Sequence, residues 1–99
     1  MKSQLLQELK YKAEPVLREH GVPFAGVFGS VARGEDSAHS DIDIMIRVPT
    51  DRVFSFVDLI RVEDQLKTVL GRNVDLVTEN GMSKYMKPTV LRELKILYE

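Results

Sequence analysis

The stretch that decides the fold reads Gly26-Val-Phe-Gly-Ser-Val-Ala-Arg-Gly34 and continues, after an acidic loop, with Asp41-Ile-Asp-Ile-Met-Ile-Arg-Val48. It predicts a strand over 24–28, a glycine turn, the start of a helix and a second strand over 41–48. Asp41 and Asp43 are two positions apart on the second strand, so the pleat places both carboxylates on one face. The isoleucines between and after them then point to the other face, into a core: Ile42, Ile44 and Ile46.

These two carboxylates suggest a metal site. Side by side they repel one another, which is costly unless a positive charge lies between them. A hard divalent cation such as Mg²⁺ prefers carboxylate and phosphate oxygens, so it is the candidate ligand for Asp41 and Asp43.

The glycine turn suggests an anion site. Gly29-Ser30 follows an apolar strand and precedes residues that can begin a helix. Free backbone N–H groups at a helix start, with a serine hydroxyl and no bulky side chain at the glycine, can cradle a phosphate. A phosphate cradle close to metal-binding carboxylates indicates a nucleoside triphosphate with its metal, and hence phosphoryl or nucleotidyl transfer.

Together, Gly29-Ser30 and Asp41-Ile-Asp43 resemble the signature of the DNA polymerase β-type nucleotidyltransferase superfamily. The fuller pattern Gly-Ser-Val-Ala-Arg-Gly…Ser-Asp-Ile-Asp-Ile is similar to the minimal nucleotidyltransferases (MNT domains), which include MntA-like antitoxins. The resemblance covers nearly the whole chain. It implies an α/β (α+β), palm-like two-layer fold with a small mixed sheet of at least three strands and about four helices.

The resemblance also implies the composition of the active site. In the family the paired aspartates bind two Mg²⁺ ions, ATP is the substrate, and a third carboxylate comes from a later strand, where Asp75 stands here. Asp75 is either a further metal ligand or the base for the attacking hydroxyl, or else a solvent-facing residue of an edge strand. Arg33 is either a contact to triphosphate oxygens or one half of a salt bridge to Glu35, Asp36 or the edge of the second strand.

The family resemblance further implies a partner. An MNT protein is typically the antitoxin of a small helical HEPN-domain toxin, and some members transfer AMP from ATP to a tyrosine of that toxin. Two alternatives stay open: a non-catalytic antitoxin that neutralises its partner by occlusion, and the catalytic subunit of a two-subunit small-molecule nucleotidyltransferase resembling the aminoglycoside-modifying enzymes. We expect the acceptor to arrive on another polypeptide, because no residues remain after the catalytic core for an acceptor-binding domain.

Composition narrows the class of protein. Ninety-nine residues suit a single domain over 1–99, and the net charge of −1 provides no basic field for nonspecific nucleic-acid binding. The chain has no cysteine, which excludes disulfides and thiolate metal sites and fits a reducing cytoplasm. No segment is apolar enough to span a membrane or to form a signal-peptide core.

Periodicity predicts the remaining elements. We expect a helix over 3–19, kinked or divided at Pro15, a strand over 73–78, and a closing helix over 88–99. We also expect His39, in the loop before the second strand, to be a bystander rather than a site residue.

A further helix is expected over 52–70, with Thr50 or Asp51 as its cap. Its predicted core stripe contains Phe56, Leu59, Ile60, Val62, Leu66, Val69 and Leu70. Three apolar residues lie partly off that stripe, and they form either core at the helix entrance or an exposed patch for a partner: Val53, Phe54 and Val57.

Overall fold

The computed structural model describes residues 2–35 and 40–99, with side chains from residue 4 onward. Within these residues the chain forms four helices and four strands, which confirms the predicted α/β class. In chain order they are α1 (Lys2–Glu19), β1 (Phe24–Phe28), α2 (Gly29–Arg33), β2 (Ile42–Arg47), α3 (Phe56–Leu70), β3 (Val74–Thr78), α4 (Lys87–Glu93) and β4 (Lys95–Tyr98).

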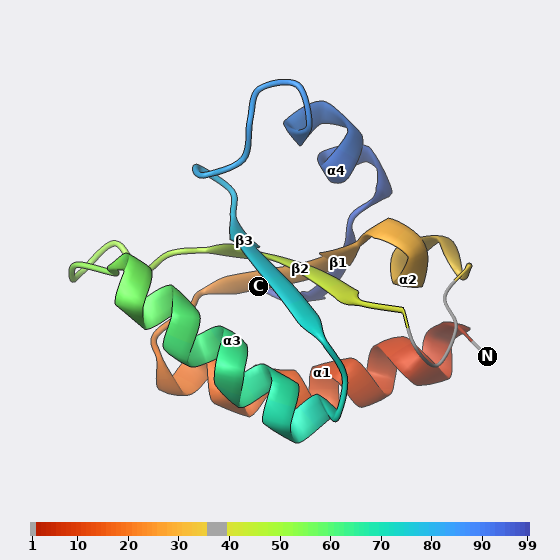
Figure 1. Cartoon of the computed structure of the whole chain (residues 1–99), viewed down its shortest axis with the longest axis horizontal. Helices are drawn as coiled ribbons and strands as arrows, with labels where there is room; N and C mark the ends of the chain where they lie inside the picture. The colour runs from red at the N-terminus through yellow and green to blue at the C-terminus, as the bar shows by residue number, and fades with distance from the viewer. Residues whose placement is uncertain (1, 36–39) are drawn as a thin grey trace.

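The four strands form one mixed sheet in the order β3-β2-β1-β4 (Figure 1). β1 runs antiparallel to both of its neighbours, β2 and β4. β2 and β3 run parallel, which requires a crossover connection, and α3 provides it. The β2–β3 register places Asp43 beside Asp75.

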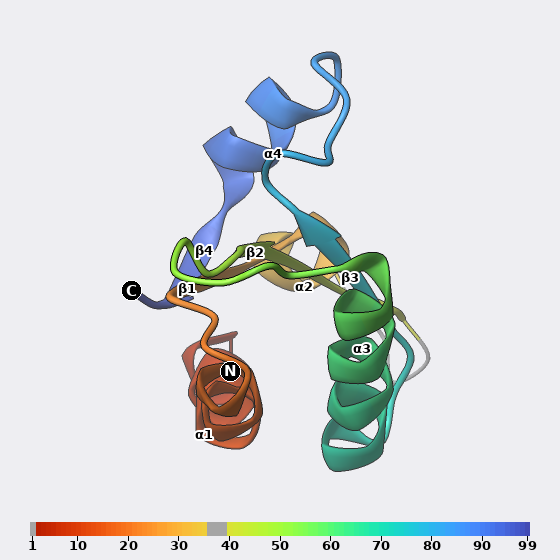
Figure 2. The same ribbon diagram turned by 90° about the vertical axis from the view of Figure 1, so that its left-hand side faces the viewer.

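The helices divide between the two faces of the sheet. α1 and α3 lie side by side beneath one face, while α4 stands over the other (Figures 1 and 2). The main core lies between the sheet and the α1–α3 layer, and a smaller cluster lies on the α4 face. The smaller cluster consists of Phe24, Phe28, Met45 and Val90, with Val77, Met82 and Leu94 packed against it.

The alternation of β2 assigns the acidic residues to the α4 face. Ile42, Ile44 and Ile46 are fully buried in the main core, as predicted. Because successive side chains alternate, Asp43 shares the opposite face with Met45, on the side of the smaller cluster.

Both long helices differ in part from their predictions. α1 runs through Pro15 as one helix, so of the two predicted effects, a kink or a division, the division does not occur. The buried residues Ala13 and Leu17 on either side of the proline hold this turn against the core. α3 begins at Phe56 rather than near 52, because Ser55 forms a capping box with Asp58.

The apolar residues around the start of α3 are mostly exposed. Val62 and Leu66 are fully buried, whereas Phe56 is 73% exposed, and Ile60 and Val69 are exposed as well. The core assignment of these last three is therefore wrong. Val53 and Val57 are exposed too, whereas Phe54 packs against the main core. The structure therefore supports an exposed apolar patch for Val53 and Val57, and core at the helix entrance for Phe54.

The predicted closing helix over 88–99 is wrong in its second half. α4 ends at Glu93, Leu94 is extended, and β4 then pairs with β1. Leu97 and Tyr98 gain burial in this arrangement. The open edge of β1 therefore outweighs the helical spacing of these apolar residues.

No helix among the described residues is both long and apolar enough to cross a membrane.

Candidate active site

The candidate site lies where β1, β2 and β3 meet α2. Asp43 is half-buried on β2, and its register partner on the parallel strand β3 is Asp75, which is exposed. Since register partners project to the same side of a sheet, the two carboxylates share the α4 face. Asp41 comes immediately before β2 and is exposed.

Gly29 brings the glycine turn against this carboxylate pair. It follows the last residue of β1, whose register partner on β2 is Asp43. Its backbone is left-handed, with φ of 74°. A Cβ at this position would collide with the Asp43 carboxylate, so the close approach and the backbone conformation both require glycine. Ser30 follows as the second residue of α2 and is half-buried.

Electrostatic repulsion concentrates on Asp43. Burial raises the pKa of its carboxyl group, and the neighbouring charges of Asp75 and Asp41 raise that pKa further. The guanidinium group of Arg33 acts in the opposite direction and lowers it. The directions of the effects of Asp75 and Asp41 agree with the repulsion that the sequence predicts.

The three aspartates offer the ligand atoms that a hard cation prefers, but their side chains do not converge on one point. All of them offer carboxylate oxygens, which suit Mg²⁺. Within residues 2–35 and 40–99, however, no three acidic or histidine side chains gather closely enough to hold a metal ion. A cation shared by Asp41, Asp43 and Asp75 therefore requires their side chains to rotate toward one another.

Arg33, the last residue of α2, makes two ion pairs. Its Nε donates to Glu35 at 2.9 Å, and its Nη1 donates to both carboxylate oxygens of Glu93 at 3.2 and 3.0 Å. The salt-bridge interpretation of Arg33 is thus correct for Glu35. The other predicted partner, Asp36, and the loop histidine His39 lie outside the described residues.

Glu93 is the site residue that the sequence did not reveal. Its Oε1 accepts a hydrogen bond from the backbone N–H of Gly29 at 3.1 Å, across 64 positions of the chain. In the sequence it stands among charged residues of an amphipathic segment. No local signal distinguishes it, because only the packing of α4 beside α2 brings it to the turn.

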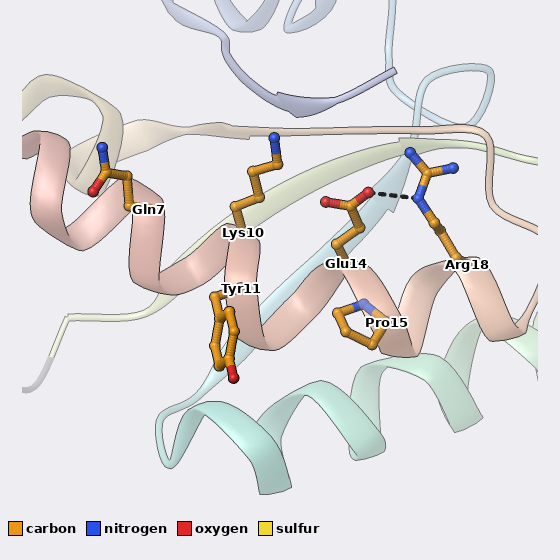
Figure 3. A pocket seen from close by; sticks show the side chains of 6 residues that line it. All are labelled: Gln7, Lys10, Tyr11, Glu14, Pro15 and Arg18. Atoms are coloured by element: carbon orange, nitrogen blue, oxygen red, sulfur yellow. Dashed lines mark hydrogen bonds and ion pairs between the residues drawn. The ribbon is translucent and has the colours of Figure 1, made fainter.

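A separate hollow lies on α1, away from these residues (Figure 3). Its lining comes from α1 alone: Gln7, Lys10, Tyr11, Glu14, Pro15 and Arg18. None of the candidate site residues lines it. The chemistry suggested by the sequence therefore belongs to the open face beside α4 and not to this hollow.

Comparison with known proteins identifies the family of this chain. The profile of the family described as "Polymerase beta, Nucleotidyltransferase" matches residues 11–99. The chain is 40% identical over 88 residues to a Methanocaldococcus jannaschii protein named "Putative protein adenylyltransferase", a match that covers 89% of this chain and 92% of the relative. It is 42% identical over 79 residues to "Protein adenylyltransferase MntA" of Thermococcus cleftensis, covering 79% of this chain and 78% of that protein.

The fold of this chain also matches that of a solved structure. The one described as "Crystal structure of the toxin-antitoxin with AMP-PNP" matches with a TM-score of 0.79 and 25% identity, covering 90% of this chain and 72% of that chain. The chain belongs to the polymerase beta nucleotidyltransferase family, and within it to the minimal nucleotidyltransferases of the MntA type.

Proposed function

We propose that this protein is a protein adenylyltransferase that transfers AMP from ATP to a hydroxyl group, a tyrosine, of a HEPN-domain toxin, and that it thereby acts as the antitoxin of a toxin–antitoxin pair in the cytoplasm. Residues 1–99 act in this proposal as one minimal nucleotidyltransferase domain. The observation that carries it is the approach of Gly29 to Asp43, with Asp75 beside Asp43 on the parallel strand. The names of the relatives support the acceptor class, since they are protein adenylyltransferases.

In this proposal each site residue has a role. The turn at Gly29 and Ser30, with Arg33, holds the phosphates that leave as pyrophosphate. Asp41, Asp43 and Asp75 hold Mg²⁺, two ions in the full site, which supplies positive charge to the phosphate oxygens when bound. The acceptor oxygen forms a bond to the α-phosphorus as the bond to pyrophosphate breaks. If Asp41 and Asp43 hold the metal without Asp75, Asp75 is the base that takes the proton of the acceptor hydroxyl group.

A label-transfer experiment tests this proposal. The purified protein is incubated with Mg²⁺, ATP labelled at the α-phosphate, and the product of the adjacent gene. We expect label on the partner protein, and loss of that label with Asp43→Asn. Asp64→Asn, which removes an exposed carboxylate from α3, serves as the matched control and should transfer label normally. Parallel reactions with the other nucleoside triphosphates determine the base preference.

The occlusion alternative, in which the protein neutralises its partner by binding alone, is tested by the same experiment. A binding-only antitoxin needs no metal. An unlabelled partner that is nevertheless silenced in a tight complex would favour this alternative over transfer.

A further inference from the structure

Glu93 occupies the groups to which we assign phosphate binding. Its carboxylate accepts from the backbone N–H of Gly29 at 3.1 Å and from Nη1 of Arg33 at 3.0 and 3.2 Å. A carboxylate and a phosphate accept the same charge-assisted hydrogen bonds from such donors. An anion is therefore already bound at the turn, and it belongs to the protein.

Packing holds the backbone around Glu93, whereas hydrogen bonds hold its side chain. Val90, one helical turn earlier, is buried in the cluster on the α4 face. Leu94, the next residue, lies against β1 so closely that a Cβ on Gly26 would collide with it. The side chain of Glu93 itself is 23% exposed. Because the side chain of Glu93 is partly exposed, displacement of its carboxylate requires rotation of this side chain and the loss of its hydrogen bonds to Gly29 and Arg33.

A phosphate and this carboxylate cannot share the turn. The single N–H of Gly29 cannot make a full hydrogen bond to two anions at once, and Arg33 already binds two carboxylates, those of Glu35 and Glu93. We propose that Glu93 is an internal counter-anion: its carboxylate occupies the position of a nucleotide phosphate, and the triphosphate must displace it to bind. This inference rests on the proposed function, and it makes Glu93 a residue that sets the affinity for nucleotide.

The opposite role would have a different signature. If Glu93 stayed in place and held Arg33 for catalysis, its removal would weaken nucleotide binding. If Glu93 competes with phosphate, its removal strengthens binding. The sign of the change in dissociation constant therefore separates a competitor from a positioning residue.

Glu93→Gln is the appropriate variant, because it removes the charge and keeps the shape. Glu79→Gln is its matched control. Glu79 is also an acceptor for an arginine, Arg47, and its side chain is 21% exposed, close to the value for Glu93. Arg47 and Glu79 lie at the ends of β2 and β3 opposite to Asp43 and Asp75, so this pair does not touch the candidate site.

Calorimetric titration with Mg²⁺ and AMP-PNP gives the first measurement. Exchange of a charged acceptor for a neutral one should make Glu93→Gln bind about five-fold more tightly than the wild-type protein. Glu79→Gln should bind as the wild-type protein does. Equal or weaker binding by Glu93→Gln, in a variant whose melting temperature shows it to be folded, would overturn the inference.

A second measurement does not depend on nucleotide transfer. Inorganic tripolyphosphate is added to ¹⁵N-labelled protein, and the Gly29 amide and Arg33 Nε resonances are followed. We expect both resonances to shift in the wild-type protein. In Glu93→Gln the shifts should occur at a lower tripolyphosphate concentration than in Glu79→Gln. Identical concentration dependence in the two variants, or no shift at Gly29, would refute displacement.

The two measurements also distinguish this inference from the proposed function. Displacement by tripolyphosphate without label transfer from ATP would leave the role of Glu93 standing and remove the adenylyltransferase proposal. Label transfer by the wild-type protein, without tighter nucleotide binding by Glu93→Gln, would support the adenylyltransferase proposal and refute the role of Glu93.

Discussion

At the scale of single residues, two glycines with the same backbone conformation differ in the space around them. Their substitution therefore distinguishes the cost of backbone strain from the cost of steric collision. Gly29 and Gly71 are both left-handed, with φ of 74° and 67°. A Cβ at Gly29 would collide with the Asp43 carboxylate, whereas one at Gly71 would meet no atom within 4 Å. Gly71→Ala should therefore lower the free energy of unfolding by about 1 kcal/mol, the cost of backbone strain alone.

Gly29→Ala should lower the free energy of unfolding further, because Asp43 must also move. Urea denaturation of both variants measures the difference. Equal losses in the two variants would mean that the Asp43 side chain rotates aside without cost, and that Gly29 is required only for its backbone conformation.

Asp43 also predicts a pH dependence of stability. Its pKa is raised in the folded protein, chiefly by burial and then by Asp75 and Asp41. The folded state therefore binds the proton more tightly than the unfolded state, and this group's contribution falls as pH rises from the unfolded pKa through the folded one. In metal-free buffer at pH 7, Asp43→Asn should thus be at least as stable as the wild-type protein.

The difference in stability between Asp43→Asn and the wild-type protein should shrink as the pH falls from the raised folded pKa toward the unfolded pKa, because Asp43 is protonated in both states only below both values. Urea denaturation with a chelator at pH 7 and pH 4 tests this. Asp64→Asn on α3 is the control. A large loss of stability for Asp43→Asn at pH 7 would contradict the electrostatic account.

At the scale of the elements, α3 has one side buried against the core and one side exposed to solvent. Leu66 is fully buried, whereas Phe56 is 73% exposed. Leu66→Ala should cost about 2–5 kcal/mol of unfolding free energy, since it leaves a cavity under the sheet. Phe56→Ala should change that free energy by no more than about 0.5 kcal/mol. Chemical denaturation of the isolated protein compares them, and comparable losses would mean that Phe56 packs against the domain.

Elements that depend on local pattern could be predicted from the sequence. The turn at Gly29 and the strand of isoleucines carry their own signals, in glycine placement and in apolar alternation. β4 carried no such signal. Its residues satisfy a helical period equally well, and only the open edge of β1 decides their conformation.

The residues of the candidate site also divide into those that the local sequence predicts and one that only the packing of the helices reveals. Gly29 and Asp43 belong to one strand–turn–strand segment of the sequence, so their approach could be predicted from it. Asp75 could be predicted because a carboxylate inside an apolar strand is unusual. Glu93 could not, since its position follows from the packing of a helix that sequence periodicity extended too far.

At the scale of the whole molecule, one hydrogen bond ties the last strand to the first turn. The hydroxyl group of Tyr98 on β4 donates to the carbonyl oxygen of Val22 at 2.7 Å, and the guanidinium group of Arg18 lies 4.3 Å from the ring centroid. Tyr98→Phe should lower the free energy of unfolding by about 1 kcal/mol, measured by urea denaturation at pH 7.

Tyr98 also gives an alkaline signature. Burial raises the pKa of its phenol to about 12. The unfolded chain ionises first, so the stability of the wild-type protein should fall as the pH rises from about 10 toward this value. Tyr98→Phe should lack that part of the fall. Parallel alkaline profiles for the two proteins would mean that the hydroxyl group is accessible to solvent.

The pairing of β1 with β4 has a consequence for how the chain reaches its structure. β1 ends at Phe28, whereas its second neighbour, β4, begins only at Lys95, after the other described elements have been synthesised. Until then one edge of this apolar strand is open, and closing the long intervening loop is an entropic cost that slows folding. During synthesis this edge is where the nascent chain is most exposed to pairing with the wrong strand.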